Sequence, residues 1–336
     1  MKSSRVLMAA LMAFVASAAE ARLRDGWAER ADAAQAPQRP PAGATIAYGA
    51  DPLQRLDLWP APGRDPAPLV LFVHGGGWKR GSKDNAASRW LPTHFPQRGY
   101  AYAAIDYRLV PAVTVEQQAG DVARALKALL ERAPQLGIDR RRVVLMGHSA
   151  GAHLVALVGT DERYLREVGL DFADLAGVIA NDGAAYDVPA QLQAGARIMQ
   201  DTYAQAFGSD PARQRALSPT HHAAAPNAPA FLLLHVQRPD GVRQAQALGR
   251  ALEAAGTAVQ FGSFPGSGMR GHMQINRRLG DPDYAPTGLV DAWLDGVFGR
   301  QRGLSDRPPR RAQARAVPSS SARTPPTSRR CRSWMP

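Results

Sequence analysis

The sequence has almost no cysteine, since Cys331 is the only one in 336 residues. A single thiol excludes an internal disulfide framework. A chain of this length can bury a hydrophobic core large enough to be stable without a disulfide or a structural metal ion. Among the eight histidines, His221, His222 and His235 are near neighbours, but no cysteine or nearby carboxylate completes a site with them. Zinc requires several converging ligands, so we expect no metal.

The N-terminal apolar run is too short to span a membrane. It extends from Val6 to Ala16, which is 11 residues, whereas a transmembrane helix needs about 20. Lys2 and Arg5 precede the run and small residues follow it, as in a secretory signal peptide. We therefore expect residues 1–21 to be a signal peptide, the mature protein to be exported (periplasmic or secreted), and no stable membrane insertion after cleavage.

The formal net charge of +12 is concentrated at the C-terminus. Residues 301–336 contain nine arginines and one acid, Asp306, and so carry +8, while residues 1–21 carry +1. The remaining +3 is too little for a basic face that follows a phosphate backbone, so we expect no nucleic-acid partner. Residues 301–336 are rich in Arg, Pro and Ser and predict a disordered basic tail. The Ala-, Arg- and Pro-rich residues 22–44 predict a linker.

Between these ends, residues 45–300 alternate short apolar runs with amphipathic stretches. The expected strands are 69–73, 100–105, 142–146, 177–180, 231–234 and 258–264, and the expected helices are 115–130, 152–158, 242–254 and 288–298. Buried strands separated by helices favour one α/β domain, with a mostly parallel central sheet and helices on both faces. The long interval between strands at residues 184–219 predicts a small lid over a pocket.

Two glycine-containing motifs each follow a predicted strand. Gly147-His148-Ser149-Ala150-Gly151 is a G-x-S-x-G pattern between a strand and a helix, where a nucleophilic serine occupies a strained turn. His74-Gly75-Gly76-Gly77 follows strand 69–73, and glycines leave backbone N–H groups open to a developing oxyanion because no Cβ blocks the approach. No Lys-Ser/Thr pair follows, which excludes a phosphate-binding P-loop. We expect no organic cofactor.

With both motifs in this order, the chain resembles α/β-hydrolases of the esterase/lipase group that carries the His-Gly-Gly-Gly motif. That group includes hormone-sensitive lipase and bacterial carboxylesterases. Segments 105–109, 147–154 and 272–276 also resemble the group, and the likeness covers about residues 45–300. The resemblance implies an α/β-hydrolase fold and serine hydrolase chemistry. Arylformamidases and feruloyl-esterase-like enzymes share the pattern, so it identifies the chemistry better than the substrate.

A serine nucleophile needs a histidine base and an orienting carboxylate, which follow it in the order acid, then histidine, in this fold. Of the eight histidines, only His272 lies beyond the last predicted strand, on a Gly-rich stretch expected to be a flexible loop. The acid is expected after the second-last strand, where Asp240 is the carboxylate. Asp182, after an earlier strand, is the reserve candidate, with turn capping or pocket formation as its alternative role. The predicted triad is Ser149, Asp240 and His272.

The N–H groups of Gly76, Gly77 and Ala150 are expected to form the oxyanion hole. Trp78 and Tyr186 are candidates for lining the substrate pocket, with packing as the alternative for both. The leading hypothesis is a serine carboxylesterase for small to medium acyl esters, with a small-molecule ester as its partner. The alternatives are an arylformamidase or feruloyl-esterase-like hydrolase and, in another class, an inactive hydrolase-like binding module.

Overall fold

The structure, a computed structural model, describes residues 40–84, 89–194 and 199–305. The predicted signal peptide, most of the predicted linker and the tail from residue 306 lie outside the described residues. Two predicted boundaries need correction. The first strand already begins at Ala44, within the predicted linker, because this residue pairs with Leu58. The last helix continues to Ser305, beyond the predicted start of the tail, since no proline interrupts the sequence before Pro308.

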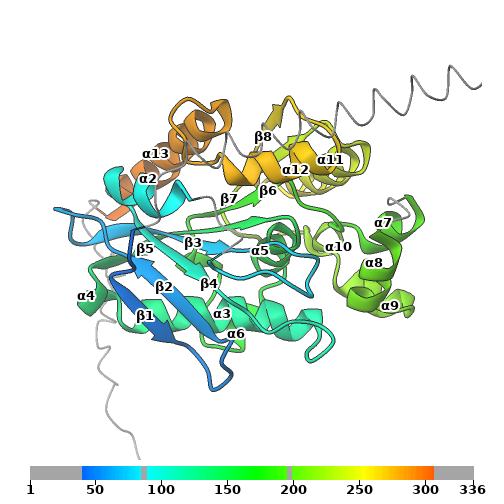
Figure 1. The fold of residues 1–336 in the computed structure, drawn as a ribbon, viewed down its shortest axis with the longest axis horizontal. Helices are drawn as coiled ribbons and strands as arrows, with labels where there is room; N and C mark the ends of the chain where they lie inside the picture. The colour runs from blue at the N-terminus through cyan, green and yellow to red at the C-terminus, as the bar shows by residue number, and fades with distance from the viewer. Residues whose placement is uncertain (1–39, 85–88, 195–198, 306–336) are drawn as a thin grey trace, which may run out of the picture.

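An eight-stranded sheet forms the centre of the molecule, in the order β1-β2-β4-β3-β5-β6-β7-β8 (Figure 1). The strands are β1 (Ala44–Ala47), β2 (Arg55–Trp59), β3 (Ala67–Val73), β4 (Ala101–Ile105), β5 (Ile138–His148), β6 (Gly177–Asn181), β7 (Ala230–Val236) and β8 (Ala258–Phe264). The strands from β3 to β8 run parallel, whereas β1 and β2 add an antiparallel edge. The predicted mostly parallel sheet is confirmed, but β1 and β2 were not predicted from the sequence.

Helices cover both faces of the sheet, as predicted. The helices on one face are α3 (Val115–Glu131), α5 (Ala150–Thr160) and α11 (Pro239–Ala254), and those on the other are α2 (Leu91–Gln97), α12 (Gly268–Arg277) and α13 (Ala285–Ser305). Figure 1 shows α3 on the side of the sheet opposite to α2 and α13. Shorter helical segments are α4 (Ala133–Leu136), α6 (Arg163–Arg166) and the 3₁₀ turn η1 (Phe172–Asp174). In the described part of the chain, no helix has the length and apolar character to span a membrane.

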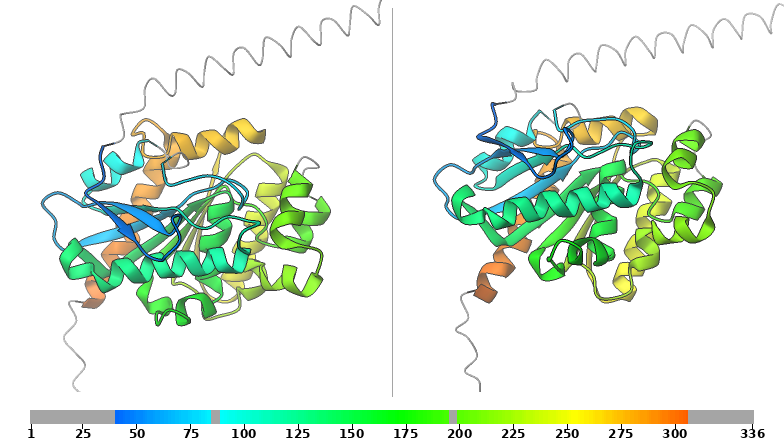
Figure 2. Two further views of the ribbon diagram at one scale, coloured as in Figure 1. Left: turned by 60° about the horizontal axis from the view of Figure 1, so that its bottom comes forward. Right: turned by 90° about the horizontal axis from the view of Figure 1, so that it is seen from below.

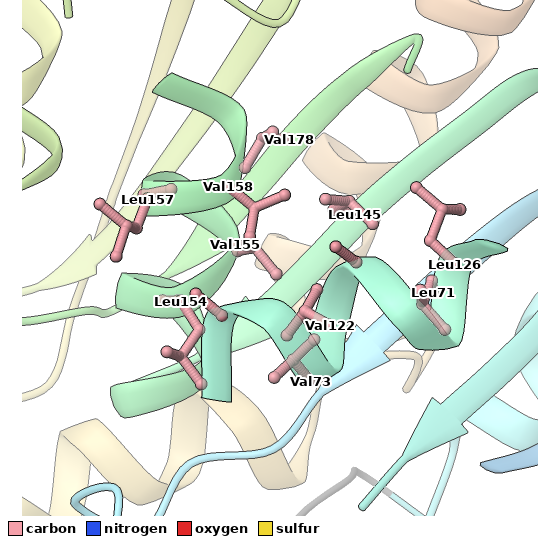
Figure 3. Packing of buried hydrophobic residues seen from close by; sticks show 14 of the residues in the cluster. Leu71, Val73, Val122, Leu126, Leu145, Leu154, Val155, Leu157, Val158 and Val178 are labelled. Atoms are coloured by element: carbon pink, nitrogen blue, oxygen red, sulfur yellow. The ribbon is translucent and has the colours of Figure 1, made fainter. Parts of the chain in front are cut away.

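The sheet separates two hydrophobic cores, as the alternation of side chains along β3 illustrates. Leu71 and Val73 belong to the core under α3 and α5, whereas Val70 and Phe72 belong to the core under α2 and α13. Successive strand residues point to opposite faces, so a strand buried on both sides is apolar throughout. Figure 3 shows Leu71 and Val73 beside apolar residues of α3 and α5.

Helix α3 begins where the sequence supplies a capping box. Thr114 accepts a hydrogen bond from the Gln117 N–H, and the Gln117 side chain accepts one from the Thr114 N–H. This reciprocal pair satisfies two otherwise unpartnered donors at the helix start. Val122 and Leu126 on its inner face are fully buried, and each contributes roughly 1.5–3 kcal/mol of burial free energy.

The described part of the interval between β6 and β7 contains four short α-helices, where a lid was predicted. They are α7 (Val188–Ala194), α8 (Gln200–Phe207), α9 (Pro211–Ala216) and α10 (Pro219–His222). Figure 2 shows α7, α8 and α9 together at one end of the molecule. These helices meet the carboxyl end of the parallel strands, where ligands bind in open α/β sheets.

Candidate active site

Ser149 occupies a sharp turn between β5 and α5, as predicted. Its backbone has φ 56° and ψ −118°, a conformation that L-residues rarely adopt, and such strain is characteristic of functional positions. The turn also requires Gly151, because a Cβ there would lie 2.1 Å from the carbonyl oxygen of Val73. The Ser149 N–H donates to the Asn181 carbonyl oxygen at 3.0 Å, which ties the turn to β6.

His272 lies beside Ser149, with its Nε2 accepting a hydrogen bond from Ser149 Oγ at 2.9 Å. It belongs to the second turn of α12 rather than to the flexible loop that the sequence predicted. The glycines before it do not prevent the helix, because His272, Ile275 and Asn276 form a buried face that packs on the sheet. The base is therefore held on a regular element, which fixes its position better than a loop would.

Asp182 is the carboxylate that contacts His272. The His272 Nδ1–H donates to Asp182 Oδ2 at 2.6 Å. Asp182 directly follows β6, and its side chain is fully buried. The Val236 N–H donates to its Oδ1 at 3.2 Å, and Arg238 Nε donates to its Oδ2 at 3.1 Å. Three donors thus orient this carboxylate, two from the end of β7 and the residues directly after it and one from α12.

The predicted acid, Asp240, occupies a different position. It lies in the first turn of α11, where its Oδ2 accepts from Gln191 Nε2 at 3.3 Å and from an Arg238 nitrogen at 3.5 Å. In the described part of the chain, no hydrogen bond joins Asp240 to His272. The prediction is therefore corrected: the connection from β7 is so short that α11 begins at Pro239, and the reserve candidate Asp182 takes the place beside the histidine.

The surroundings of Asp182 favour its ionised form. Burial by itself would raise its pKa, but the hydrogen bond from His272 and the positive charge of Arg238 outweigh burial and hold the pKa below its usual value. An ionised Asp182 accepts a hydrogen bond from Nδ1–H of His272. The proton therefore stays on Nδ1, and the unprotonated nitrogen, Nε2, faces Ser149. The three side chains therefore have the geometry of a serine nucleophile, a histidine base and a carboxylate that orients the histidine.

His148 also contacts His272, a contact that the sequence did not reveal because His148 occupies a variable position of G-x-S-x-G. The two rings lie 4.5 Å apart, and His148 Nε2–H donates to the His272 carbonyl oxygen at 2.9 Å. Burial, together with the nearby His272, lowers the pKa of His148 to about 3. His148 is therefore neutral at neutral pH and can support His272 without adding a charge beside it.

The three predicted oxyanion donors lie around the nucleophile. A Cβ on Gly75 would lie 2.9 Å from Ser149 Cβ, so the glycine loop passes directly over the serine. Ala150 is the first residue of α5, where helix N–H groups have no intrahelical partner. Among the described residues, no hydrogen bond engages the N–H groups of Gly76, Gly77 or Ala150. The loop and the helix start thus present free donors near Ser149 Oγ.

His74 stabilises the conformation of this glycine loop. Its Nδ1–H donates to the Gly75 carbonyl oxygen at 2.7 Å, and its ring stacks on Tyr107 at 4.2 Å. The Tyr107 hydroxyl in turn donates to the His74 carbonyl oxygen at 3.0 Å. Burial lowers the pKa of His74 to about 4, so the ring remains a neutral packing element at neutral pH.

Ser149 and His272 line a cavity of about 290 Å³. Met199 and Thr202 bring the start of α8 to its wall, and Met269 and Met273 bring α12. The segment predicted as a lid therefore does contribute to the cavity, whereas the three thioether side chains were not predicted from the sequence. The described residues contain no group of three His, Cys, Asp or Glu side chains that could hold a metal ion.

Trp78 and Tyr186 do not line this cavity, which corrects their predicted role. Trp78 is 2% exposed, donates from Nε1 to His153 at 3.3 Å and packs against Phe207 at 4.8 Å. Tyr186 is 1% exposed and packs so closely that a Cβ on Gly183 would lie 2.1 Å from its hydroxyl. Both are core residues, and each buries a large aromatic ring against its neighbours, which is favourable.

The chain is similar in sequence to known proteins. The BD-FAE family model matches residues 56–249, more than half of the chain. A probable isoprenylcysteine alpha-carbonyl methylesterase of Oryza sativa subsp. japonica is 37% identical over 113 residues, which are 33% of this chain and 27% of that protein. The kynurenine formamidase of Danio rerio is 25% identical over 267 residues, 73% of this chain and 79% of that protein. The match to the methylesterase thus spans about a quarter of that relative's length.

Solved structures agree on the fold. The crystal structure of esterase B from Lactobacillus rhamnosis superposes with a TM-score of 0.66 at 24% sequence identity, covering 92% of this chain and all of that chain. The predicted α/β-hydrolase fold is confirmed by this likeness and by the strand order.

Proposed function

Since the chain belongs to the BD-FAE family of the esterase/lipase group, we propose that it is a serine carboxylesterase acting on small to medium acyl esters. One observation carries the proposal: Ser149 Oγ, His272 and Asp182 form a continuous hydrogen-bonded chain, with distances of 2.9 and 2.6 Å. Ser149 and His272 line a cavity, and the nearby N–H groups of Gly76, Gly77 and Ala150 have no hydrogen-bond partner among the described residues. An esterase requires this combination of nucleophile, base, acid and oxyanion donors.

The acylation step uses all of these groups. Ser149 Oγ attacks the ester carbonyl carbon while His272 Nε2 takes the hydroxyl proton, and ionised Asp182 stabilises the resulting imidazolium. The N–H groups of Gly76, Gly77 and Ala150 bind the oxyanion, and the loss of one such donor typically reduces the rate by about 10²–10³. His272 then gives its proton to the leaving alcohol oxygen, and the acyl group remains on Ser149.

Deacylation repeats the sequence with water. His272 takes a proton from a water molecule as its oxygen attacks the acyl carbon, and the same N–H groups bind the second oxyanion. Collapse of this intermediate breaks the bond to Ser149 Oγ, which recovers its proton from His272, and the carboxylic acid leaves. No cofactor is needed for either step.

The size of the cavity indicates the acyl chain length. Its volume of about 290 Å³ is at the lower end of the usual range for small-molecule sites, about 300–1,000 Å³. Met199, Met269 and Met273 give it flexible apolar walls. We therefore expect acetyl and butyryl esters to be hydrolysed more efficiently than octanoyl esters.

The test measures hydrolysis of p-nitrophenyl acetate, butyrate and octanoate by the purified chain, together with labelling by a fluorophosphonate. Both activities should disappear in Ser149→Ala and persist in Ser209→Ala, a control at an exposed serine. An aryl formamide and a feruloyl ester, the alternative substrates expected from the sequence, belong in the same assay. Well-folded protein that neither labels nor turns over any of these substrates would favour the inactive binding module instead.

Export is part of the proposal and rests on the sequence of residues 1–21. Expression of the full chain in a bacterial host, followed by fractionation and N-terminal sequencing, tests it. Export predicts a shortened protein outside the cytoplasm, with cleavage near Ala18 or Ala21. Full-length protein retained in the cytoplasm would contradict it.

A further inference from the structure

Lys79 and Arg80, which both carry cationic side chains, are among the residues that line the cavity around Ser149, and no aspartate or glutamate is among its described lining residues. In the described part of the chain, no hydrogen bond or ion pair engages either cation. The internal segments outside the description, 85–88 and 195–198, contain no aspartate or glutamate. The contrast with Lys83 is direct, because that lysine binds Asp57 at 2.9 Å.

Lys79 and Arg80 are fixed close to the proposed oxyanion donors. The loop from Gly75 to Gly81 folds back on itself so tightly that a Cβ on Gly76 would lie 2.0 Å from the Arg80 carbonyl oxygen. A Cβ on Gly81 would lie 2.4 Å from the Gly75 carbonyl oxygen. Gly76 and Gly81 therefore have a second role. They allow the part of the loop that carries Lys79 and Arg80 to pack against the part that passes over Ser149.

Three methionines contribute to the other walls of the cavity, and the nearby acids are directed elsewhere. The Met199, Met269 and Met273 side chains line it from α8 and α12. Asp84 pairs with Lys83 at 3.2 Å, and Asp201, although on α8, is exposed and does not line the cavity. A bound ester therefore meets thioethers and also two cationic residues for which the described part of the chain shows no hydrogen bond or ion pair.

We propose that this site selects esters that carry an anionic group, such as a carboxylate, and that Lys79 and Arg80 bind that group. The inference rests on the proposed esterase function and adds a substrate class to it. Cations at the mouth of a cleft raise the local concentration of an anionic substrate and its association rate, by factors of about 10–10³ in steered systems. Salt screens this attraction, with a Debye length of about 10 Å at 0.1 M.

The test uses two pairs of esters that differ in charge and hardly in shape. In 4-acetoxybenzoate and 4-acetoxybenzamide the difference is on the alcohol part; in 4-nitrophenyl 4-carboxybenzoate and its 4-carbamoyl analogue it is on the acyl part. We expect the anionic member of at least one pair to have a kcat/KM about tenfold higher at low salt, after division by its spontaneous hydrolysis rate. The ratio should fall towards one at high salt, and the pair that responds identifies the part of the ester that carries the anion.

Two double variants separate a local effect from a change in net charge. In Lys79→Met/Arg80→Gln the preference for the anionic ester should fall to near one. Lys127→Met/Arg250→Gln removes the same charge at a half-exposed position of α3 and an exposed position of α11, neither of which lines the cavity, and should retain the preference. Thermal melts verify that both variants are folded.

The outcomes distinguish this inference from the proposed function. A wild-type ratio near one, or an unchanged ratio in Lys79→Met/Arg80→Gln, overturns the selection of anions, while hydrolysis of the neutral esters still supports the esterase. If the wild-type protein hydrolyses neither member of either pair and is not labelled by the fluorophosphonate, the esterase proposal fails and the inference fails with it.

Discussion

At the scale of single residues, the carboxylate of Asp182 is held by three donors: His272 at 2.6 Å, Arg238 at 3.1 Å and the Val236 N–H at 3.2 Å. They come from two segments, the end of β7 with the residues directly after it and α12, and both segments are more than 50 residues away in sequence. Chain order pointed to Asp240, but the contacts of Asp182 arise only when β6, β7 and α12 meet at one edge of the sheet.

His148 is expected to act as a positioning residue for His272. The variant His148→Phe keeps a ring in place but removes the donor to the His272 carbonyl oxygen. We expect kcat for p-nitrophenyl butyrate to fall by up to about tenfold with little change in KM, and the free energy of unfolding to fall by about 1–3 kcal/mol. Steady-state kinetics and urea unfolding measure both. A destabilised variant with an unchanged kcat would show that His148 only fills space.

At the scale of elements, the turn between β5 and α5 depends on close approach to β3. Gly147 and Gly151 face each other in this turn, and a Cβ on Gly147 would lie 2.3 Å from the Gly151 carbonyl oxygen. Since that oxygen belongs to the backbone, the clash is relieved only by moving α5. The G-x-S-x-G pattern is thus a packing requirement as well as a catalytic signature.

The variant Gly151→Ala tests this requirement. Its Cβ would clash with the Val73 carbonyl oxygen at 2.1 Å, and we expect a loss of about 1–3 kcal/mol or more in the free energy of unfolding. The control is Gly288→Ala in α13, where a Cβ meets nothing within 4 Å and should stabilise the helix by up to about 1 kcal/mol. Urea unfolding of both variants measures the difference, and equal stabilities would contradict the packing argument.

The elements that the sequence predicted well are those with unambiguous patterns. β3 was predicted within two residues, because its wholly apolar run after a turn is distinctive. The strand 258–264 was predicted with its observed bounds, although it includes Gln260 and Ser263. β1 has only four residues, and β2 includes Arg55 and Asp57, so neither stands out. Helix α12 was missed because glycines suggested a loop, whereas the burial of its inner face, which stabilises the helix, depends on the rest of the fold.

At the scale of the whole molecule, three buried histidines surround the site without carrying charge. Burial lowers the pKa of His74 to about 4, that of His153 to about 4 and, with the effect of nearby His272, that of His148 to about 3. The ordinary pKa of 6.5 returns when the chain unfolds. Folding therefore excludes protons from three imidazoles.

This exclusion predicts a loss of stability in mild acid. Between pH 6.5 and 5 the unfolded chain binds protons at these three histidines while the folded protein does not, so the free energy of unfolding decreases as pH falls. Each histidine contributes up to about 1.4 kcal/mol per pH unit in this interval. Urea unfolding between pH 5 and 8 measures how the free energy of unfolding changes with pH. This dependence should be steep below pH 6.5, and in His153→Gln it should be weaker by the contribution of one histidine. A stability that is flat from pH 8 to 5 would contradict the burial of neutral histidines.

The pairing of His272 with Asp182 rather than Asp240 is tested most directly by comparing Asp182→Asn with Asp240→Asn. Kinetics with p-nitrophenyl butyrate give kcat, and thermal melts verify that both variants are folded. Loss of the carboxylate that orients the histidine should reduce kcat by about 10³–10⁴, so we predict this loss in Asp182→Asn and near wild-type activity in Asp240→Asn. The reverse result, an active Asp182→Asn and an inactive Asp240→Asn, would contradict the account of the site.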